Sequence, residues 1–115
     1  MIVRTWRGAT RATDADAYVE HLMKTGIPEY EATTGNRGTL LLHRAVGDRE
    51  EFLILSWWDS LDAIHGFAGD DIASAVFYPE DERYLVERDL EAHHWEVGYA
   101  SVGRPTIPDD LVSGG

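Results

Sequence analysis

The side chains best suited to acid–base chemistry near neutral pH are five histidines, because imidazole is the only side chain that titrates there without a large perturbation. We therefore expect any general base among the histidines or among buried carboxylates. His93 and His94 are neighbours in a predicted strand, so their side chains point to opposite faces of a sheet. One of them is expected to enter a pocket between sheet and helices. The alternative for each of these two histidines is a structural, hydrogen-bonded role. His21 and His65 are expected to be exposed to solvent, the alternatives being that His21 flanks Tyr18 and that His65 lines a cavity.

The spacing of the histidines does not indicate a metal site. No two of them stand four residues apart with a carboxylate, as they do on the helix of a metalloprotease. The chain has no cysteine, which excludes thiolate ligands, disulfides and thiol catalysis. A glycine-rich phosphate loop between a strand and a helix is also absent. We expect neither a metal nor an organic cofactor.

Aromatic side chains form the second informative set. They make up 10% of the chain, and most are expected in the core or at an interface, where large rings bury the most surface. Trp6 and Trp58 stand near the ends of predicted strands, and Tyr78 directly precedes Pro79. Together these aromatic residues could line a cavity for a flat apolar ligand.

The charge balance argues against nucleic acids and anionic membranes as partners. The 115 residues include 21 acidic and 10 basic side chains, for a net charge of −11, whereas binding to phosphates depends on Lys and Arg. No apolar run approaches the roughly 20 residues of a membrane span, and residues 1–4 begin a strand pattern rather than a signal peptide. The expected location is the cytoplasm.

The element order is predicted to be β-α-β-β-α-β. Strands are expected at residues 2–9, 39–46, 51–58 and 90–99. The first helix is expected at 14–25, where Gly26 and Pro28 end it, and the second crossover consists of short helical pieces at 61–69, 70–77 and 79–88. Two crossovers around a hairpin are typical of the ferredoxin-like α+β fold with a four-stranded antiparallel sheet.

The length fits one domain, which we place at residues 1–100. Residues 101–115 contain two prolines and three glycines and are predicted to be a C-terminal extension without a core of its own.

The central hairpin carries apolar side chains on both faces. Residues 40–42 and 52–55 are continuous apolar runs, whereas a half-exposed strand alternates between apolar and polar residues. The chain's own helices can cover one face. The other face requires a partner, and a second copy of the same sheet is the simplest candidate. We therefore expect a homodimer.

Several segments resemble small proteins of the antibiotic biosynthesis monooxygenase superfamily. The resemblance covers residues 1–99, and its motifs are specific for the fold and subfamily but weak for activity. In this sequence the motifs are Gly35-Asn36-Arg37-Gly38, Trp58-Asp59-Ser60-Leu61-Asp62-Ala63-Ile64, Phe67-Ala68-Gly69, Ala75, Tyr78-Pro79-Glu80-Asp81, Leu85 and His94-Trp95-Glu96-Val97.

The resemblance implies a dimeric α/β barrel in which two four-stranded sheets pack face to face. Characterised relatives oxygenate electron-rich polycyclic phenols with O₂ and without a metal or flavin, others degrade heme, and further proteins of the same barrel are polyketide cyclases or lyases. The heme degraders use an Asn on the first strand with a Trp and a His. Here the only Asn is Asn36, in a loop, and Trp58 is similar to the family's Trp but has no His partner after His65.

The leading hypothesis is a cofactor-independent, monooxygenase-like enzyme that acts on a small aromatic or polyketide-type substrate. In this chemistry a base removes a proton, and the electron-rich anion then reduces O₂ directly. The protein supplies a base, donors that stabilise the anion, and a dry aromatic slot.

Six residues are assigned roles in this hypothesis from strand parity and from the resemblance. His94 is the expected base or donor to the anion, with His65 in reserve. Tyr78 and Trp58 are expected donors or walls, and Trp6 and Phe67 are expected walls. Two alternatives stay open: a cyclase or lyase that uses a His and Tyr pair, and a non-catalytic dimeric binding protein whose cavity has no histidine pointing inward.

Overall fold

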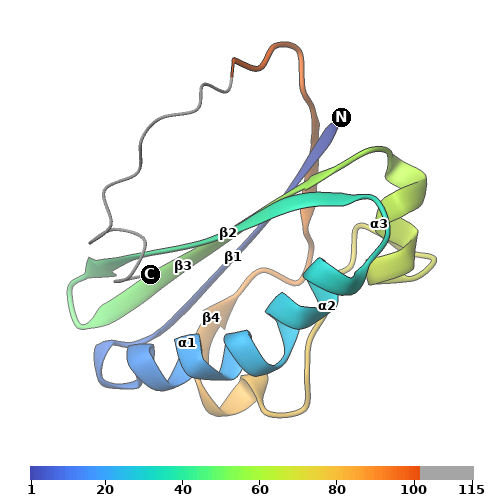
Figure 1. Cartoon of the computed structure of the whole chain (residues 1–115). Coiled ribbons are helices and arrows are strands. Elements are labelled where there is room, and N and C mark those ends of the chain that lie inside the picture. Colours follow the sequence, from blue (N-terminus) through green and yellow to red (C-terminus); the bar gives the residue numbers. More distant parts are fainter. Residues whose placement is uncertain (102–115) are drawn as a thin grey trace, which may run out of the picture.

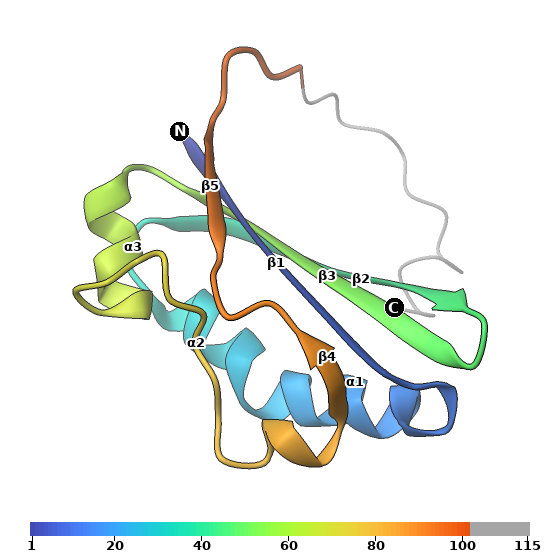
Figure 2. The same cartoon turned by 180° about the vertical axis from the view of Figure 1, so that it is seen from behind.

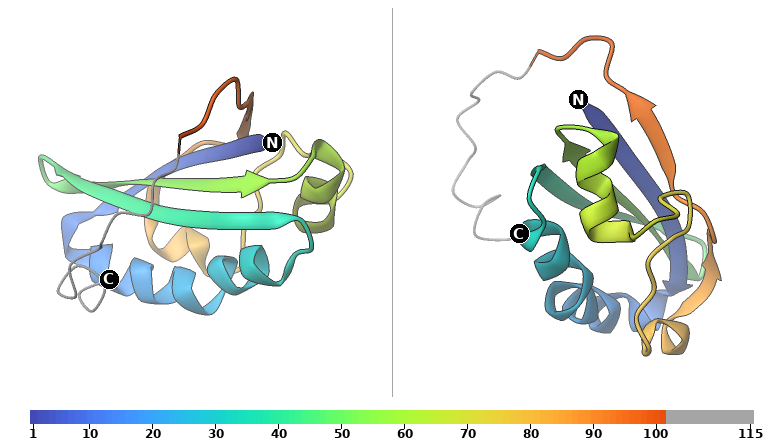
Figure 3. Two further views of the ribbon diagram at one scale, coloured as in Figure 1. Left: turned by 45° about the horizontal axis from the view of Figure 1, so that its top comes forward. Right: turned by 90° about the vertical axis from the view of Figure 1, so that its right-hand side faces the viewer.

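The chain folds into two layers, an antiparallel sheet and a set of helices on one of its faces (Figure 1; Figure 3). The computed structural model describes residues 1–101, and the extension predicted at 101–115 lies outside the described residues from residue 102 on. Two short 3₁₀ turns, Ala12–Asp14 and Asp81–Arg83, accompany the main elements. The helices and strands are β1 (Ile2–Arg11), α1 (Ala15–Lys24), α2 (Gly26–Ala32), β2 (Asn36–Val46), β3 (Arg49–Trp58), α3 (Leu61–Ala68), β4 (Leu85–Arg88) and β5 (His93–Glu96).

The strand order is β2-β3-β1-β4, and β5 also pairs with β1. Every one of these pairings is antiparallel. β4 pairs with β1 at Gly8–Thr10, whereas β5 pairs with β1 at Ile2–Thr5, so the two short strands share one edge (Figure 2). Together they occupy the place of the fourth strand, which confirms the ferredoxin-like α+β fold with five strands in place of four.

The second crossover differs from the sequence prediction. The helix expected at 79–88 is a 3₁₀ turn followed by β4, and the strand expected at 90–99 is shortened to β5. Local helix propensity in 79–88 is overridden because β4 satisfies backbone groups along the edge of β1. Residues 70–77 form no helix but an irregular segment, with a turn at 72–73 and an isolated bridge between Ser74 and Glu91. The Ala75 amide donates to Leu90 O at 2.9 Å, and the Ala92 amide donates to Ala73 O at 2.8 Å.

The helices pack their apolar stripes on the face of the sheet formed by β1 and β3. The predicted break after the first helix is confirmed at Thr25, between α1 and α2. Ser60 caps α3, because its Oγ accepts a hydrogen bond from the Ala63 amide at 3.2 Å. The shared core consists of Trp6, Tyr18, Leu22, Ile27, Tyr30, Phe52, Ile54, Trp58 and Ile64.

Gly8 allows the Trp6 side chain to lie across β1. A Cβ at position 8 would stand 2.5 Å from Cη2 of Trp6, which is too close for two carbon atoms that are not bonded. The indole Nε1 donates to the carbonyl of Asp89 at 2.8 Å, and this bond fixes the ring. The bare glycine backbone therefore sets the position of one wall of the site described below.

The opposite face of the sheet is uncovered by any helix of residues 1–101 (Figure 3). Leu40, Leu42 and Leu53 lie on this outer face and are 45%, 41% and 37% exposed. Trp95 also lies there and is 60% exposed. In the described part of the chain, no helix is long and apolar enough to cross a membrane.

Candidate functional site

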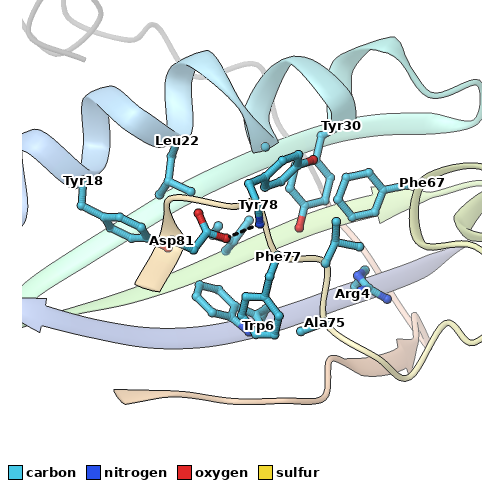
Figure 4. A pocket seen from close by; sticks show the side chains of 13 residues that line it. Arg4, Trp6, Tyr18, Leu22, Tyr30, Phe67, Ala75, Phe77, Tyr78 and Asp81 are labelled. Carbon is cyan, nitrogen blue, oxygen red and sulfur yellow. Dashed lines mark hydrogen bonds between the residues drawn. The ribbon is translucent and has the colours of Figure 1, made fainter. Parts of the chain in front are cut away.

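A cavity lies between the sheet and the helices, and the segment 75–78 borders it on its remaining side (Figure 4). Its volume is about 30 Å³, which is room for roughly one or two water molecules. β1, β3, all three helices and the second crossover contribute to its walls. The lining residues are Arg4, Trp6, Tyr18, Leu22, Gly26, Tyr30, Ile54, Phe67, Ala75, Val76, Phe77, Tyr78 and Asp81.

Aromatic rings form most of the cavity wall. Tyr30 and Phe67 stack with their ring centres 4.1 Å apart. Phe77 meets Trp6 edge to face at 6.1 Å. Tyr78 approaches the cavity from the segment 75–78 (Figure 4). A planar ligand would therefore meet ring faces and edges on several sides, which favours flat conjugated molecules over flexible ones.

Arg4 supplies a positive charge to this apolar cavity. Its side chain is 2% exposed, because the alternation of β1 turns residue 4 to the same face as Trp6. Nη1 donates to the Ile72 carbonyl at 2.5 Å, and Nη2 donates to the Ser74 carbonyl at 3.2 Å. Nε has no hydrogen-bond partner among the described residues. Burial lowers the pKa of Arg4, an effect that Tyr30 partly opposes.

His94 lies behind Arg4 rather than in the cavity wall. Nη1 of Arg4 is 2.9 Å from Nε2 of His94, and since arginine can only donate, Nε2 accepts. Burial lowers the pKa of His94, and the charges of Arg4 and His93 lower it further. His94 is thus held as a neutral imidazole, with its Nε2 lone pair engaged by the guanidinium.

Asp81 provides a carboxylate on the opposite side of the cavity from Arg4 (Figure 4). Its Oδ1 lies 2.6 Å from Nε2 of His21, and its Oδ2 accepts from the Tyr78 amide at 2.7 Å. The side chains of His21 and Asp81 are 8% and 5% exposed, so the solvent exposure expected for His21 is wrong. This buried pair can accept, hold or return a proton.

The tyrosines around the cavity are held in the protonated form. Burial is the main cause for each of them. It raises the pKa of Tyr78 to about 12, with smaller contributions from Glu29, Tyr30 and Asp81. The pKa values of Tyr18 and Tyr30 are also raised, although the positive charge of Arg4 counteracts part of the effect on Tyr30. At neutral pH these hydroxyls can therefore act as hydrogen-bond donors.

The structure brings together only some of the residues singled out from the sequence. Trp6, Phe67 and Tyr78 line the cavity. Trp58 is fully buried behind it, and its Nε1 donates to Ser56 Oγ at 2.8 Å. His65 is exposed at the end of α3, where Nδ1 lies 2.8 Å from the Gly69 carbonyl oxygen.

Sequence reasoning missed Arg4, Asp81 and His21 as members of one site. The sequence could have indicated Arg4, since residues 4 and 6 of one strand point to the same face and Trp6 is expected in the core. Asp81 and His21 are separated by 60 positions, and no local pattern links them. Within residues 1–101, no group of three or more His, Cys, Asp or Glu side chains could hold a metal ion.

Solved structures share this fold at low sequence identity. A proposed antibiotic biosynthesis monooxygenase from Bacillus cereus is 16% identical, with a TM-score of 0.64 over 89% of this chain and 97% of that one. A protein of unknown function from Nitrosomonas europaea is 13% identical, with a TM-score of 0.61 over 90% and 95% of the two chains. The heme degrader MhuD from Mycobacterium tuberculosis, with two hemes in its active site, is 20% identical, with a TM-score of 0.54 over 90% and 100%.

These likenesses establish the fold. The chain has the ferredoxin-like fold of antibiotic biosynthesis monooxygenase proteins. No family model and no curated protein matches the sequence.

The cavity does not fit a heme. The volume of about 30 Å³ admits neither a heme nor a smaller aromatic ring unless the segment 72–78 moves, so the side chains that line the cavity decide between them. No histidine is among the described residues that line the cavity. The donors present, a guanidinium, a carboxylate and tyrosine hydroxyls, suit a small organic molecule better than a porphyrin.

Proposed function

We propose that this chain is a cofactor-independent, monooxygenase-like enzyme acting on a small, electron-rich aromatic or polyketide-type molecule. The observation that carries the proposal is the aromatic cavity, with the Asp81 carboxylate on one side and the Arg4 guanidinium on the other (Figure 4). A base and a cation separated by ring walls match the needs of a reaction that generates an aromatic anion. The shared fold of a proposed monooxygenase adds support.

In the proposed reaction, Asp81 accepts a proton from a phenol or from an activated carbon of the substrate, and His21 stabilises the protonated pair. Tyr78 donates a hydrogen bond to the developing anion. The anion transfers an electron to O₂, and the two radicals combine in a C–O bond to give a peroxide anion. The proton held by Asp81 returns to this anion and gives a hydroperoxide. Loss of water leaves a quinone. One oxygen atom stays in the product and the other leaves as water, so phenol and O₂ give quinone and water without an external reductant.

The proton acceptor in this proposal is Asp81 rather than His94, because Arg4 engages the accepting nitrogen of His94. His94 becomes a positioning residue that orients the guanidinium. His65 lies on the surface at the end of α3, and we assign it a role in the helix end only.

The proposed functional unit is a homodimer that joins the outer faces of two sheets. The exposed leucines at positions 40, 42 and 53 form an apolar band there. Arg7 and Arg44 pair with Glu51 at 2.7 Å beside this band. A hydrophobic centre with a polar rim is the usual composition of a dimer interface.

A binding protein without catalysis is the second candidate function. Two observations favour it: no histidine lines the cavity among the described residues, and the cavity is small. In this case Arg4 and the aromatic walls would hold a ligand, and Asp81 would serve only to anchor Tyr78 through its amide.

Oxygen uptake by the purified protein separates these functions. The probes are a series of mono- and bicyclic phenols and hydroquinones, with product analysis by mass spectrometry. We expect uptake of one O₂ per oxygenated product, with Asp81→Asn reducing the rate about 100-fold or more and Tyr78→Phe reducing it less. Met23→Gln, on the exposed side of α1, is the control. Product without O₂ uptake would indicate a cyclase or lyase, and binding without turnover would indicate the second candidate.

A further inference from the structure

Arg4 is a buried cation without an anionic partner in the described part of the chain. All three of its hydrogen bonds go to neutral acceptors, namely two backbone carbonyls and the imidazole of His94. Nε is buried and has no partner among residues 1–101. Since a guanidinium has five N–H donors, a substantial part of its capacity remains open.

Such an arrangement is unfavourable unless something else compensates the charge. Burying an ionised group costs several kcal/mol when no opposite charge accompanies it. Asp81 is the only carboxylate among the described cavity residues, and it is bonded to His21 and to the Tyr78 amide on the far side (Figure 4). Arg4 and Asp81 form no ion pair within residues 1–101.

The environment of Arg4 also limits the shape of an incoming anion. The guanidinium carbon lies 5.7 Å from the centre of the Phe67 ring, which stacks on Tyr30. The Tyr30 hydroxyl is a protonated donor near the same guanidinium. An anion whose negative oxygen contacts Arg4 would therefore place the rest of its atoms between these aromatic rings.

We propose that Arg4 is an anion-binding residue and that the cavity takes a small, planar, conjugated acid whose carboxylate, phenolate or enolate oxygen contacts Nε and Nη2. The Tyr30 hydroxyl gives a further hydrogen bond to the same oxygen or its neighbour. The inference rests on the cavity being the substrate site of the proposed function, and it defines the substrate class of that site. Charge-assisted bonds from a guanidinium to a carboxylate are the strong kind in proteins.

Ligand entry involves the crossing segment 72–78. The cavity as described has about 30 Å³, less than any aromatic ring requires, so this segment has to move outward. The carbonyls of Ile72 and Ser74, which Arg4 bonds, lie on the same segment. An anion on Nε and Nη2 therefore replaces the Ser74 carbonyl, occupies the open Nε donor and frees one of the two contacts that hold the segment to Arg4.

Calorimetric titration of the full chain with matched acids and amides tests the inference. The probes are benzoate and 1-naphthoate, each compared with its neutral amide. We expect the acid to bind at least about 10-fold tighter than the amide of the same shape. Arg4→Gln should reduce acid affinity about 10- to 100-fold and leave amide affinity within about 3-fold. Arg4→Lys should keep part of the preference, and Arg37→Gln, which removes a surface arginine, should change neither.

Thermal unfolding of each variant shows that it is folded, and the comparison of acid with amide on the unmodified chain stands even if Arg4→Gln does not fold. Equal affinity for acid and amide, no binding of either acid, or a preference retained in folded Arg4→Gln would overturn the inference. Preferential binding of the acid without O₂ uptake would refute the proposed function but support the anion site. Turnover with O₂ uptake but without preference for the acid would support the proposed function and refute the anion site.

Discussion

Nη1 of Arg4 donates a hydrogen bond to Nε2 of His94 across 2.9 Å. Arginine stays protonated and cannot accept, so the lone pair belongs to Nε2 and the imidazole proton to Nδ1. The bond exists only while His94 is neutral, because a protonated imidazole would oppose the guanidinium. Protonation of His94 at low pH would therefore remove a hydrogen bond that holds the Arg4 guanidinium.

Stability should fall as the pH decreases below about 6.5, and His94 should account for part of the loss. Burial and the charges of Arg4 and His93 lower the pKa of His94 from its usual 6.5. Below 6.5 the unfolded chain takes up a proton at this position while the folded chain does not, so unfolding is favoured as the pH falls through the window between the two pKa values. The contribution is at most about 1.4 kcal/mol per pH unit.

Urea unfolding of the unmodified chain and of His94→Gln between pH 7.5 and 5.5 measures this contribution. The glutamine carbonyl still accepts from Arg4 but does not titrate, so the variant should lose less stability over the range. His65→Gln removes a surface histidine and should keep the original slope. Parallel curves for the unmodified chain and His94→Gln would contradict the pH coupling.

Arg4→Gln should loosen the crossing segment as well as the anion site. The guanidinium joins β1 to the carbonyls of Ile72 and Ser74, and a shorter amide cannot reach both. We expect the free energy of unfolding to fall by about 1–3 kcal/mol. Hydrogen exchange should accelerate at the amides of Ala75 and Ala92, whose hydrogen bonds hold residues 75 and 73 of this segment. Unchanged exchange at both amides would show that the segment is held independently of Arg4.

Asp81→Asn tests the buried carboxylate–histidine pair. Asn can still accept from the Tyr78 amide with its oxygen, and its amide can donate to Nε2 of His21 if that imidazole carries its proton on Nδ1. The fold should therefore survive with a loss of about 1–3 kcal/mol, whereas Asp81→Ala, which leaves His21 unpaired, should cost about 3–5 kcal/mol. Chemical denaturation measures both, and equal stability of all three chains would refute a structural contribution of the pair.

Gly8→Ala should displace the Trp6 ring. The new Cβ would lie 2.5 Å from Cη2 of Trp6 and 3.1 Å from Cδ2 of Leu85, so the indole must move and lose its bond to the Asp89 carbonyl. Overpacking of this kind costs about 1–3 kcal/mol. Gly98→Ala is the matched control, because nothing lies within 4 Å of its added Cβ. Thermal unfolding and tryptophan fluorescence should change in the first variant and stay constant in the second.

The architecture was largely predictable from local patterns, and the exception has a physical cause. The central hairpin follows from two apolar runs around a Gly-Asp turn, and the break at Thr25 follows from Gly26 and Pro28. Residues 79–88 carry strong helix formers, yet 85–88 form β4. The backbone groups along the edge of β1 decide this outcome, and they lie more than 70 positions away in the sequence.

The aromatic lining of the cavity could be predicted from the sequence, but its charged residues could not. Trp6, Phe67 and Tyr78 are large aromatic residues, and such residues often wall pockets. The structure places Trp6 in the middle of β1, not near a strand end as the sequence suggested. The meeting of Asp81 with His21 depends on how the second crossover returns over α1, which no local spacing encodes. Strand parity is the one rule that could have placed Arg4 beside Trp6.

Substitution of Leu42 by Asp should dissociate the proposed homodimer. Leu42 is 41% exposed on the outer face, where a second sheet would bury it, and an unpaired carboxylate in a buried interface is unfavourable. We expect the dimer dissociation constant to rise at least about 100-fold in sedimentation equilibrium, while the monomer stays folded because the core lies on the other face of the sheet. Met23→Asp, which adds the same charge at a 53% exposed position of α1, should leave the dimer intact. A monomeric unmodified chain at micromolar concentration would refute the face-to-face assembly and would leave the leucine band of β2 and β3 exposed to solvent.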